Sequence, residues 1–168
     1  MKQARGFSLV ELLVSVALFS ILMLVVGMVF QRGEEQTDLN NHRMIMQENL
    51  REALYKMGQE IRESAPSRVT ISNGGTTLTF QIPASISNSG TITWSAPIIY
   101  QMGGTGRQLV RTSGGQNTVF ANDVQGLNFT ASGAPVDTIL YSVTLQRTSN
   151  NGRILSIVST GEARLRNP

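Results

Sequence analysis

The stretch RGFSLVELLVSVALF, residues 5–19, places one carboxylate inside an otherwise apolar run. From Phe7 to Phe30 there are 24 residues, and Glu11 is the only one with a formal charge. A carboxylate in the middle of a membrane costs about 2.5–3.5 kcal/mol even on the lenient insertion scale. Residues of this kind are rare there and typically mark a function that requires a charged partner. We therefore predict that Glu11 is a functional residue.

The apolar run itself has the length of a membrane span. Twenty-four helical residues extend roughly 36 Å, and a hydrocarbon core is about 30 Å thick. Lys2 and Arg5 precede the run, so the positive-inside rule keeps the short amino-terminal tail in the cytoplasm and sends the rest of the chain across. A secretory signal peptide is the alternative, but its apolar region would span about 7–15 residues before a small-residue cleavage site. The longer run and residues 26–35, VGMVFQRGEE, do not match that pattern.

A second helical pattern follows the apolar run. Apolar residues recur at spacings of three, four and seven, which places them on one helix face: Leu39, Met46, Leu50, Ala53, Leu54, Met57 and Ile61. Glu52 and Lys56 lie four apart on a face that can meet water. Pro66 disfavours helical geometry at Ala65, so the helix should end there. We expect one helix from about Phe7 to Ser64, loosened near Gly33.

Beyond Arg68 the pattern changes to short strands. Apolar and polar residues alternate on both sides of Asn73-Gly74-Gly75, which is a strong hairpin signal. Further strand-like runs are separated by clusters of Gly, Ser and Asn, without helical segments between them. This order predicts an α+β fold in which one antiparallel sheet packs on the apolar face of the long helix. We divide the chain into residues 1–6, a transmembrane helix 7–30, its amphipathic continuation 31–65, and a sheet domain 66–168.

Composition excludes several classes of function. The formal charge of +3 falls to +1 when Lys2 and Arg5 are set aside, so nucleic acid is not an expected partner. The chain has no cysteine, which leaves the domain without disulfides. His42 is the only histidine, and we expect it to be solvated or partner-facing, because metal sites need clustered ligands. No metal, cofactor or catalytic group is predicted.

Other motifs have a structural interpretation. Gly103–Gly106 lacks the Gly-Lys-Ser/Thr ending of a phosphate-binding loop and predicts a turn between strands. Asp123 and Asp137 are too few for calcium, which takes about 6–8 oxygen ligands. Trp94 is expected in the core, as is typical of large aromatic residues. None of these residues predicts chemistry.

The amino-terminal motif resembles the leader of type IV prepilins. The features that carry the resemblance are a basic tail, Gly6, the aromatic Phe7, and Glu11 at the fifth position of the mature chain. In that family a prepilin peptidase cuts after the glycine and methylates the new amino terminus. The resemblance therefore implies cleavage after Gly6, loss of the leader charges Lys2 and Arg5, and a methylated Phe7. It also implies that Glu11 pairs with the Phe7 amine of a neighbouring subunit.

The carboxyl-terminal segments extend the resemblance to minor subunits. Residues 95–168 are loosely similar to W-type minor pilins and to J-type pseudopilins of type II secretion. Major pilins usually carry a proline at the position of Met28 and a disulfide loop, and both are missing here. The resemblance implies a minor pilin that helps to initiate a type IV pilus and lies near its tip. It also implies insertion in the bacterial inner membrane before assembly, with a periplasmic carboxyl-terminal domain.

Three functions remain open from the sequence. The first is the minor pilin; the second is the J-type pseudopilin; the third, less favoured, is a binding module for a surface or for DNA during uptake. Partners implied for the first two are other pilins or pseudopilins, the prepilin peptidase, an inner-membrane assembly platform and membrane lipid. In residues 69–168 six arginines exceed three acidic residues by three, which is typical of a solvated surface. Sheet edges, with Arg107 and Arg111, are expected to provide specificity for neighbouring subunits.

Overall fold

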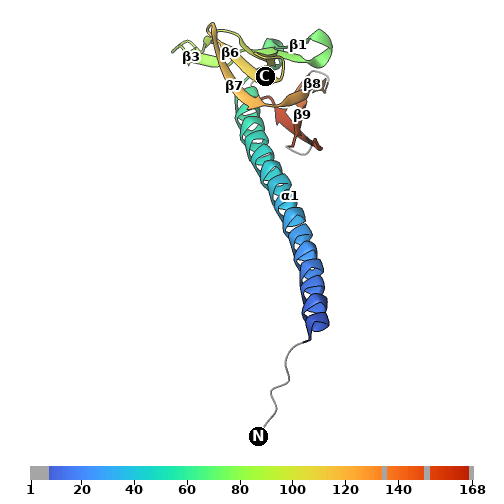
Figure 1. Ribbon diagram of the computed structural model, residues 1–168. Coiled ribbons are helices and arrows are strands. Elements are labelled where there is room, and N and C mark those ends of the chain that lie inside the picture. The colour runs from blue at the N-terminus through green and yellow to red at the C-terminus, as the bar shows by residue number, and fades with distance from the viewer. Residues whose placement is uncertain (1–7, 134–135, 150–151, 167–168) are drawn as a thin grey trace. The chain divides into compact units, whose positions relative to one another are not determined.

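The computed structural model describes residues 8–133, 136–149 and 152–166. In these residues one long helix, α1, precedes all of the strands, β1 to β10 (Figure 1). The chain divides into two compact units, Met1–His42 and Arg43–Pro168, and α1 contributes to both. The predicted α+β class, with a long amino-terminal helix and antiparallel strands after it, is confirmed.

Helix α1, Leu9–Arg62, runs for 54 residues. In the first unit its apolar side chains are exposed on every side, from Leu9 at 78% to Phe30 at 70%. A helix that is apolar all round belongs in a membrane or a large core, and α1 is long and apolar enough to cross a membrane. The expected loosening near Gly33 is wrong, because α1 continues through this residue and the Thr37 hydroxyl donates to its carbonyl at 2.9 Å.

In the second unit α1 buries one face, as the periodicity predicts. The buried side chains are at most 8% exposed: Met46, Leu50, Ala53, Leu54, Met57 and Ile61. On the exposed face Lys56 Nζ lies 2.6 Å from Glu52 Oε1. The helix ends at Arg62, and Ala65 takes an extended conformation before Pro66, at the start of the 3-10 helix η1 (Pro66–Arg68). The predicted stop signal is therefore confirmed.

The larger sheet has five antiparallel strands in the order β1-β2-β5-β6-β7. Their bounds are Val69–Ser72, Thr77–Phe80, Ile98–Gly103, Gln108–Ser113 and Gln116–Asn122. The turn η2, Asn73–Gly75, joins β1 to β2 with positive φ at all three residues, so the predicted hairpin is confirmed. Gly104 and Gly106, at φ 63° and 82°, turn the chain between β5 and β6, which confirms the strand turn there.

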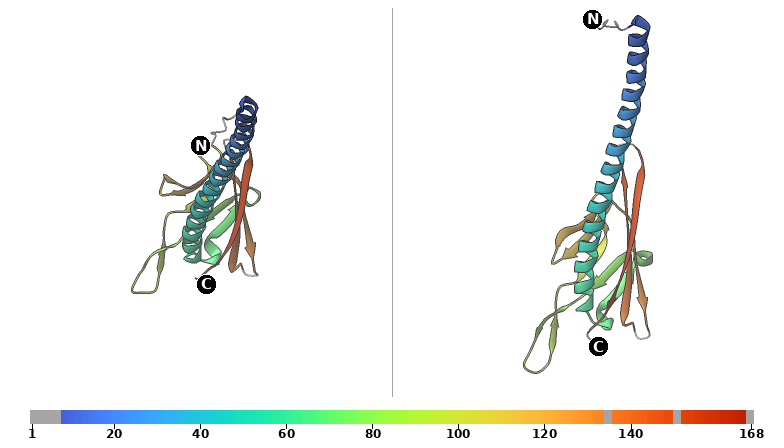
Figure 2. Two further views of the ribbon diagram at one scale, coloured as in Figure 1. Left: turned by 60° about the horizontal axis from the view of Figure 1, so that its bottom comes forward. Right: turned by 90° about the horizontal axis from the view of Figure 1, so that it is seen from below.

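The other strands form two smaller sheets. One has the order β10-β9-β8, with bounds Ile154–Arg164, Thr138–Thr148 and Val124–Ser132; the other pairs β3, Pro83–Ile86, with β4, Ile92–Trp94. The long strands β9 and β10 run side by side in Figure 2. The prediction of a single sheet is wrong. Asp123, at φ 59°, turns the chain after β7, and Gln146 N–H donates to its carbonyl at 2.8 Å, so β8 pairs with β9.

The core of the second unit lies between α1 and the inner faces of the two larger sheets. The Tyr141 hydroxyl of β9 donates to the Leu54 carbonyl of α1 at 3.4 Å. On the five-stranded sheet Tyr100 stacks on Phe80 at 6.0 Å and meets the edge of Phe120 at 5.4 Å. These contacts bury Tyr100 completely. Such aromatic pairs contribute to the stability of a core beyond the apolar area that they bury.

Trp94 is not part of this core, so the prediction for it is wrong. Among the described strands β4 pairs with β3 alone, and Trp94 is partly exposed there. The Arg68 guanidinium covers its ring at 5.1 Å from the centroid. This cation–π contact with Arg68 stabilises the Trp94 ring, which is not covered by the core of the two larger sheets.

Candidate functional site

The amino-terminal motif is described from Ser8 onward. Gly6, Phe7, Lys2 and Arg5 lie outside the described residues. Glu11 stands in the first turn of α1, on an exposed helix surface. Glu11 therefore lies within the apolar part of the helix, as the sequence predicts. Its pairing with the Phe7 amine of a neighbouring subunit stays a prediction.

Glu11 also caps the amino terminus of α1. The Ser8 backbone N–H donates to Glu11 Oε2 at 3.4 Å, and Leu12 N–H donates to the Ser8 carbonyl at 3.1 Å. Ser-x-x-Glu before an apolar run is the capping-box pattern, in which the glutamate satisfies a free amide of the first turn. Sequence reasoning missed this role, although Ser8-Leu9-Val10-Glu11 shows the pattern.

The other polar side chains of the apolar segment are satisfied within the helix. The Ser15 hydroxyl donates to the Glu11 carbonyl and the Ser20 hydroxyl to the Val16 carbonyl, each at 2.8 Å. Within the described residues Glu11 Oε1 accepts no hydrogen bond, and the bond to Oε2 is long. The arrangement therefore presents one carboxylate oxygen, on an apolar surface, to an external donor or cation.

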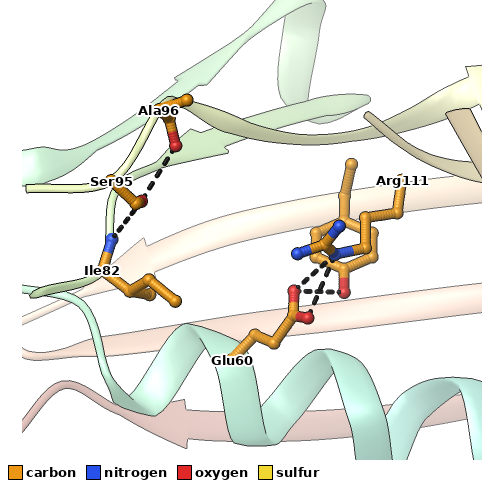
Figure 3. A network of polar contacts seen from close by, with 6 residues as sticks. Glu60, Ile82, Ser95, Ala96 and Arg111 are labelled. Atoms are coloured by element: carbon orange, nitrogen blue, oxygen red, sulfur yellow. Dashed lines mark hydrogen bonds and ion pairs between the residues drawn. The ribbon is translucent and has the colours of Figure 1, made fainter. Parts of the chain in front are cut away.

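A second polar cluster ties α1 to the five-stranded sheet (Figure 3). Arg111 Nε donates to both carboxylate oxygens of Glu60, at 3.0 and 2.9 Å, and the Tyr100 hydroxyl donates to Oε2 at 2.9 Å. The Glu60 carboxylate raises the pKa of Arg111, chiefly through its hydrogen bonds. Burial, and then the charge of Glu60, raise the pKa of Tyr100. The cluster holds a charged pair and a neutral phenol at the boundary of the core.

Arg111 is bound within this chain, and the expectation that Arg107 and Arg111 serve neighbouring subunits stays a prediction. The Arg111 side chain is 22% exposed and bound to Glu60, because β6 directs it toward α1. The Arg107 guanidinium donates to the Gln146 carbonyl, which links the five-stranded sheet to β9. Fifty-one residues separate Glu60 from Arg111, and no local pattern could have revealed this pairing.

The remaining candidate residues form no chemical site. His42 Nε2 lies 3.4 Å from Asp38 Oδ1, one helical turn away. Asp137 lies 3.8 Å from Arg164, and Asp123 supplies a backbone acceptor to Gln146. In the described part of the chain no group of three His, Cys, Asp or Glu residues could hold a metal. The candidate functional features are therefore Glu11 with its apolar helix and the surfaces of the second unit.

The comparisons with known proteins agree with the amino-terminal motif. The family model for the prokaryotic N-terminal methylation motif matches residues 1–27. No curated protein and no solved structure matches the chain. The motif, followed by one long helix and antiparallel sheets, agrees with the layout of type IV pilin-like proteins. Such a leader implies processing by a prepilin peptidase and assembly with other pilins, and the apolar helix fits an anchor in the inner membrane.

Proposed function

We propose that this chain is a minor pilin, a structural subunit that helps to initiate a type IV pilus and lies near its tip. The observation that carries the proposal is the exposed carboxylate of Glu11 on an apolar helix that continues, without a break, into a folded unit. The apolar surface needs neighbouring helices or lipid, and Glu11 needs a cation. A filament of similar helices supplies both.

The proposed topology follows from the same segment. Residues 1–6 are the cleaved leader, 7–30 span the inner membrane with the amino terminus in the cytoplasm, and 31–65 and 66–168 lie in the periplasm. Cleavage after Gly6 frees a Phe7 amine, which Glu11 of a neighbouring subunit neutralises. Breaking one partner of a buried ion pair costs about 3–5 kcal/mol, so the pair specifies the axial register of the helices.

Two features support a minor subunit. Helix α1 continues through Met28, where the proline of major pilins would stand, and the chain has no cysteine. The alternative is a J-type pseudopilin of type II secretion, which shares these features. A role in DNA uptake or adhesion is less well supported, because the clustered basic stripe expected for DNA is not evident in the sequence. The proposed subunit has no enzymatic activity of its own.

Mass spectrometry of the membrane-bound and filament-bound chain tests the proposal. We expect a mature amino terminus at methylated Phe7 and the chain in purified pili at low copy number. Gly6→Val should leave the full-length precursor in the inner membrane, since the peptidase approaches a residue without a side chain. Gly27→Val, in the apolar part of α1 where an added Cβ meets open space, is the control and should be processed normally. An amino terminus elsewhere than Phe7 in the wild type contradicts the proposal.

A further inference from the structure

The edge strand β7 lacks the usual protection of an exposed sheet edge. In the described part of the chain it pairs with β6 alone. Its sequence, QNTVFAN, has no charged residue and no proline, and Gln116 to Val119 are exposed. Natural edges are typically protected by charges, prolines or a covering element. The edge strand β10, by contrast, carries exposed Glu162 and Arg164.

The register of β6 and β7 shows which backbone groups point outward. Gly114 and Gly115, at φ 56° and 79°, form a two-residue turn closed by the pair Ser113 and Gln116. Such a closing pair exchanges hydrogen bonds, and bonded and non-bonded pairs then alternate along an antiparallel ladder. Asn117 and Val119 fall on the non-bonded positions. Their N–H and carbonyl groups therefore point away from β6, and a second strand could bind them.

A groove lies beside this edge. Its volume is about 240 Å³, and its walls come from α1 and β7: Glu52, Ala53 and Lys56 on the helix, and Thr118, Val119 and Phe120 on the strand. Ala53 is 1% exposed and forms the floor, whereas Val119 is 47% exposed at the rim. Figure 1 shows β7 beside the last turns of α1. The groove offers a place for side chains of a strand added to β7.

The chemistry of the groove defines its occupant. The two charges at the rim, Lys56 and Glu52, already pair at 2.6 Å, so the groove presents no net charge. A charged side chain entering it would lose hydration without gaining a partner. The outward amides bind a peptide backbone in extended form, as in β-strand addition. The occupant is therefore an extended strand with uncharged side chains.

We propose that β7 and this groove bind an exposed strand of the neighbouring subunit, a chain with the same amino-terminal motif. The choice of a neighbouring subunit rests on the proposed function. The groove is walled by α1, the helix whose apolar part would lie against the helices of adjacent subunits. The leader motif implies assembly with other pilins, so such a chain is the expected source of the added strand. Backbone pairing then provides affinity, and the side chains that enter the groove provide specificity for one neighbouring subunit.

The test uses the full-length chain in its own cells, with a photo-reactive amino acid at Thr118. Light should produce an adduct whose cross-linked peptide is a strand of another chain with the prepilin-type motif. Val119→Lys, which puts a charge at the edge, and Val119→Pro, which removes an outward N–H, should each reduce the adduct at least about tenfold, equivalent to about 1.4 kcal/mol. Val158→Lys is the matched control, because Val158 is 61% exposed on the other long edge strand, and should leave the adduct unchanged.

Several results would overturn the inference. They are an adduct that both Val119 variants leave intact, loss of the adduct in Val158→Lys instead, and an adduct formed only with proteins that lack the prepilin-type motif. Normal processing and an unchanged unfolding temperature in detergent verify that each variant is folded. If Val119→Pro does not fold, Val119→Lys decides. A wild-type chain that enters filaments without forming an adduct refutes this inference alone, whereas a folded and processed chain absent from filaments refutes the proposed function.

Discussion

At the scale of single residues, two carboxylates have different surroundings. Glu11 lies on an exposed apolar helix with one oxygen unbound by the described residues, whereas Glu60 accepts three hydrogen bonds from Arg111 and Tyr100. The first is suited to an external partner, because a charge in an apolar environment requires one. The second is satisfied within the unit, and we expect it to contribute to the stability of that unit.

Two variants of Glu11 separate capping from charge pairing. Glu11→Gln keeps an oxygen that can accept the Ser8 N–H but loses the negative charge, whereas Glu11→Leu loses both. If charge pairing with Phe7 governs assembly, both variants should insert in the membrane normally and enter filaments poorly. Quantitative immunoblots of membrane and filament fractions measure this. Normal incorporation of Glu11→Gln together with failure of Glu11→Leu would show that capping is the essential role.

Arg111→Met should destabilise the second unit. The substitution leaves the Glu60 carboxylate without its charged donor, and loss of such a hydrogen bond costs about 1–3 kcal/mol. Denaturant unfolding of the full-length chain in detergent measures the change. Lys56→Met is the matched control, because Lys56 and Glu52 form an exposed pair of little expected value. Equal stability of the two variants would mean that the Glu60 cluster contributes nothing.

Tyr100 predicts a loss of stability in alkali. Burial and the Glu60 charge raise its pKa above the ordinary value of about 10. As the pH rises through about 10, the phenol of Tyr100 ionises in the unfolded chain but stays neutral in the folded one. Ionisation therefore favours the unfolded chain. The contribution of Tyr100 to the free energy of unfolding is complete below about pH 10 and is lost as the pH rises further. The free energy of unfolding is measured at about pH 8 and at about pH 11. Its decrease between the two pH values should be smaller for Tyr100→Phe than for the wild type. Tyr141, whose pKa burial also raises, retains part of the effect, and Tyr55→Phe, on an exposed side chain, is the control.

At the scale of elements, glycines set the distance between α1 and the three-stranded sheet. Tyr141 of β9 is paired with Gly161 of β10, and its ring covers that glycine. Its hydroxyl reaches α1 at Gly58, where an added Cβ would lie 2.5 Å from the oxygen. A tyrosine therefore fills the space that two glycines leave open. This packing lets the Tyr141 hydroxyl meet the Leu54 carbonyl.

Gly161→Ala should therefore destabilise the unit. The new Cβ would lie 2.6 Å from Tyr141 Cζ, and overpacking of this kind costs about 1–3 kcal/mol. Gly126→Ala, on β8, is the matched control, because its nearest contact is an ordinary 3.6 Å to Thr144. Thermal unfolding of both variants provides the comparison. If Gly161→Ala is as stable as Gly126→Ala, Tyr141 is free to move and does not set this distance.

At the scale of the whole molecule, an apolar helix and a folded unit are joined in one chain, and assembly is the expected use of both. Deletion of the chain should reduce the number of pili per cell, since an initiating subunit is lost, and complementation should restore it. Electron microscopy of counted filaments measures this. A normal pilus number with reduced export of a folded protein would favour the pseudopilin alternative.

The long helix, its stop at Pro66, the first hairpin and the position of Glu11 on the apolar part of the helix were determined by the sequence alone. Each rests on local chemistry: apolar periodicity, the conformation before proline, positive φ at Asn73-Gly74, and the cost of a charge in an apolar run. Tertiary structure decided the rest. The turn at Asp123 separates β7 from β8 and divides the predicted single sheet, which leaves β7 as an edge. The packing of α1 on the five-stranded sheet brings Arg111 of β6 to Glu60, 51 residues away, and no short sequence pattern encodes a contact over that separation.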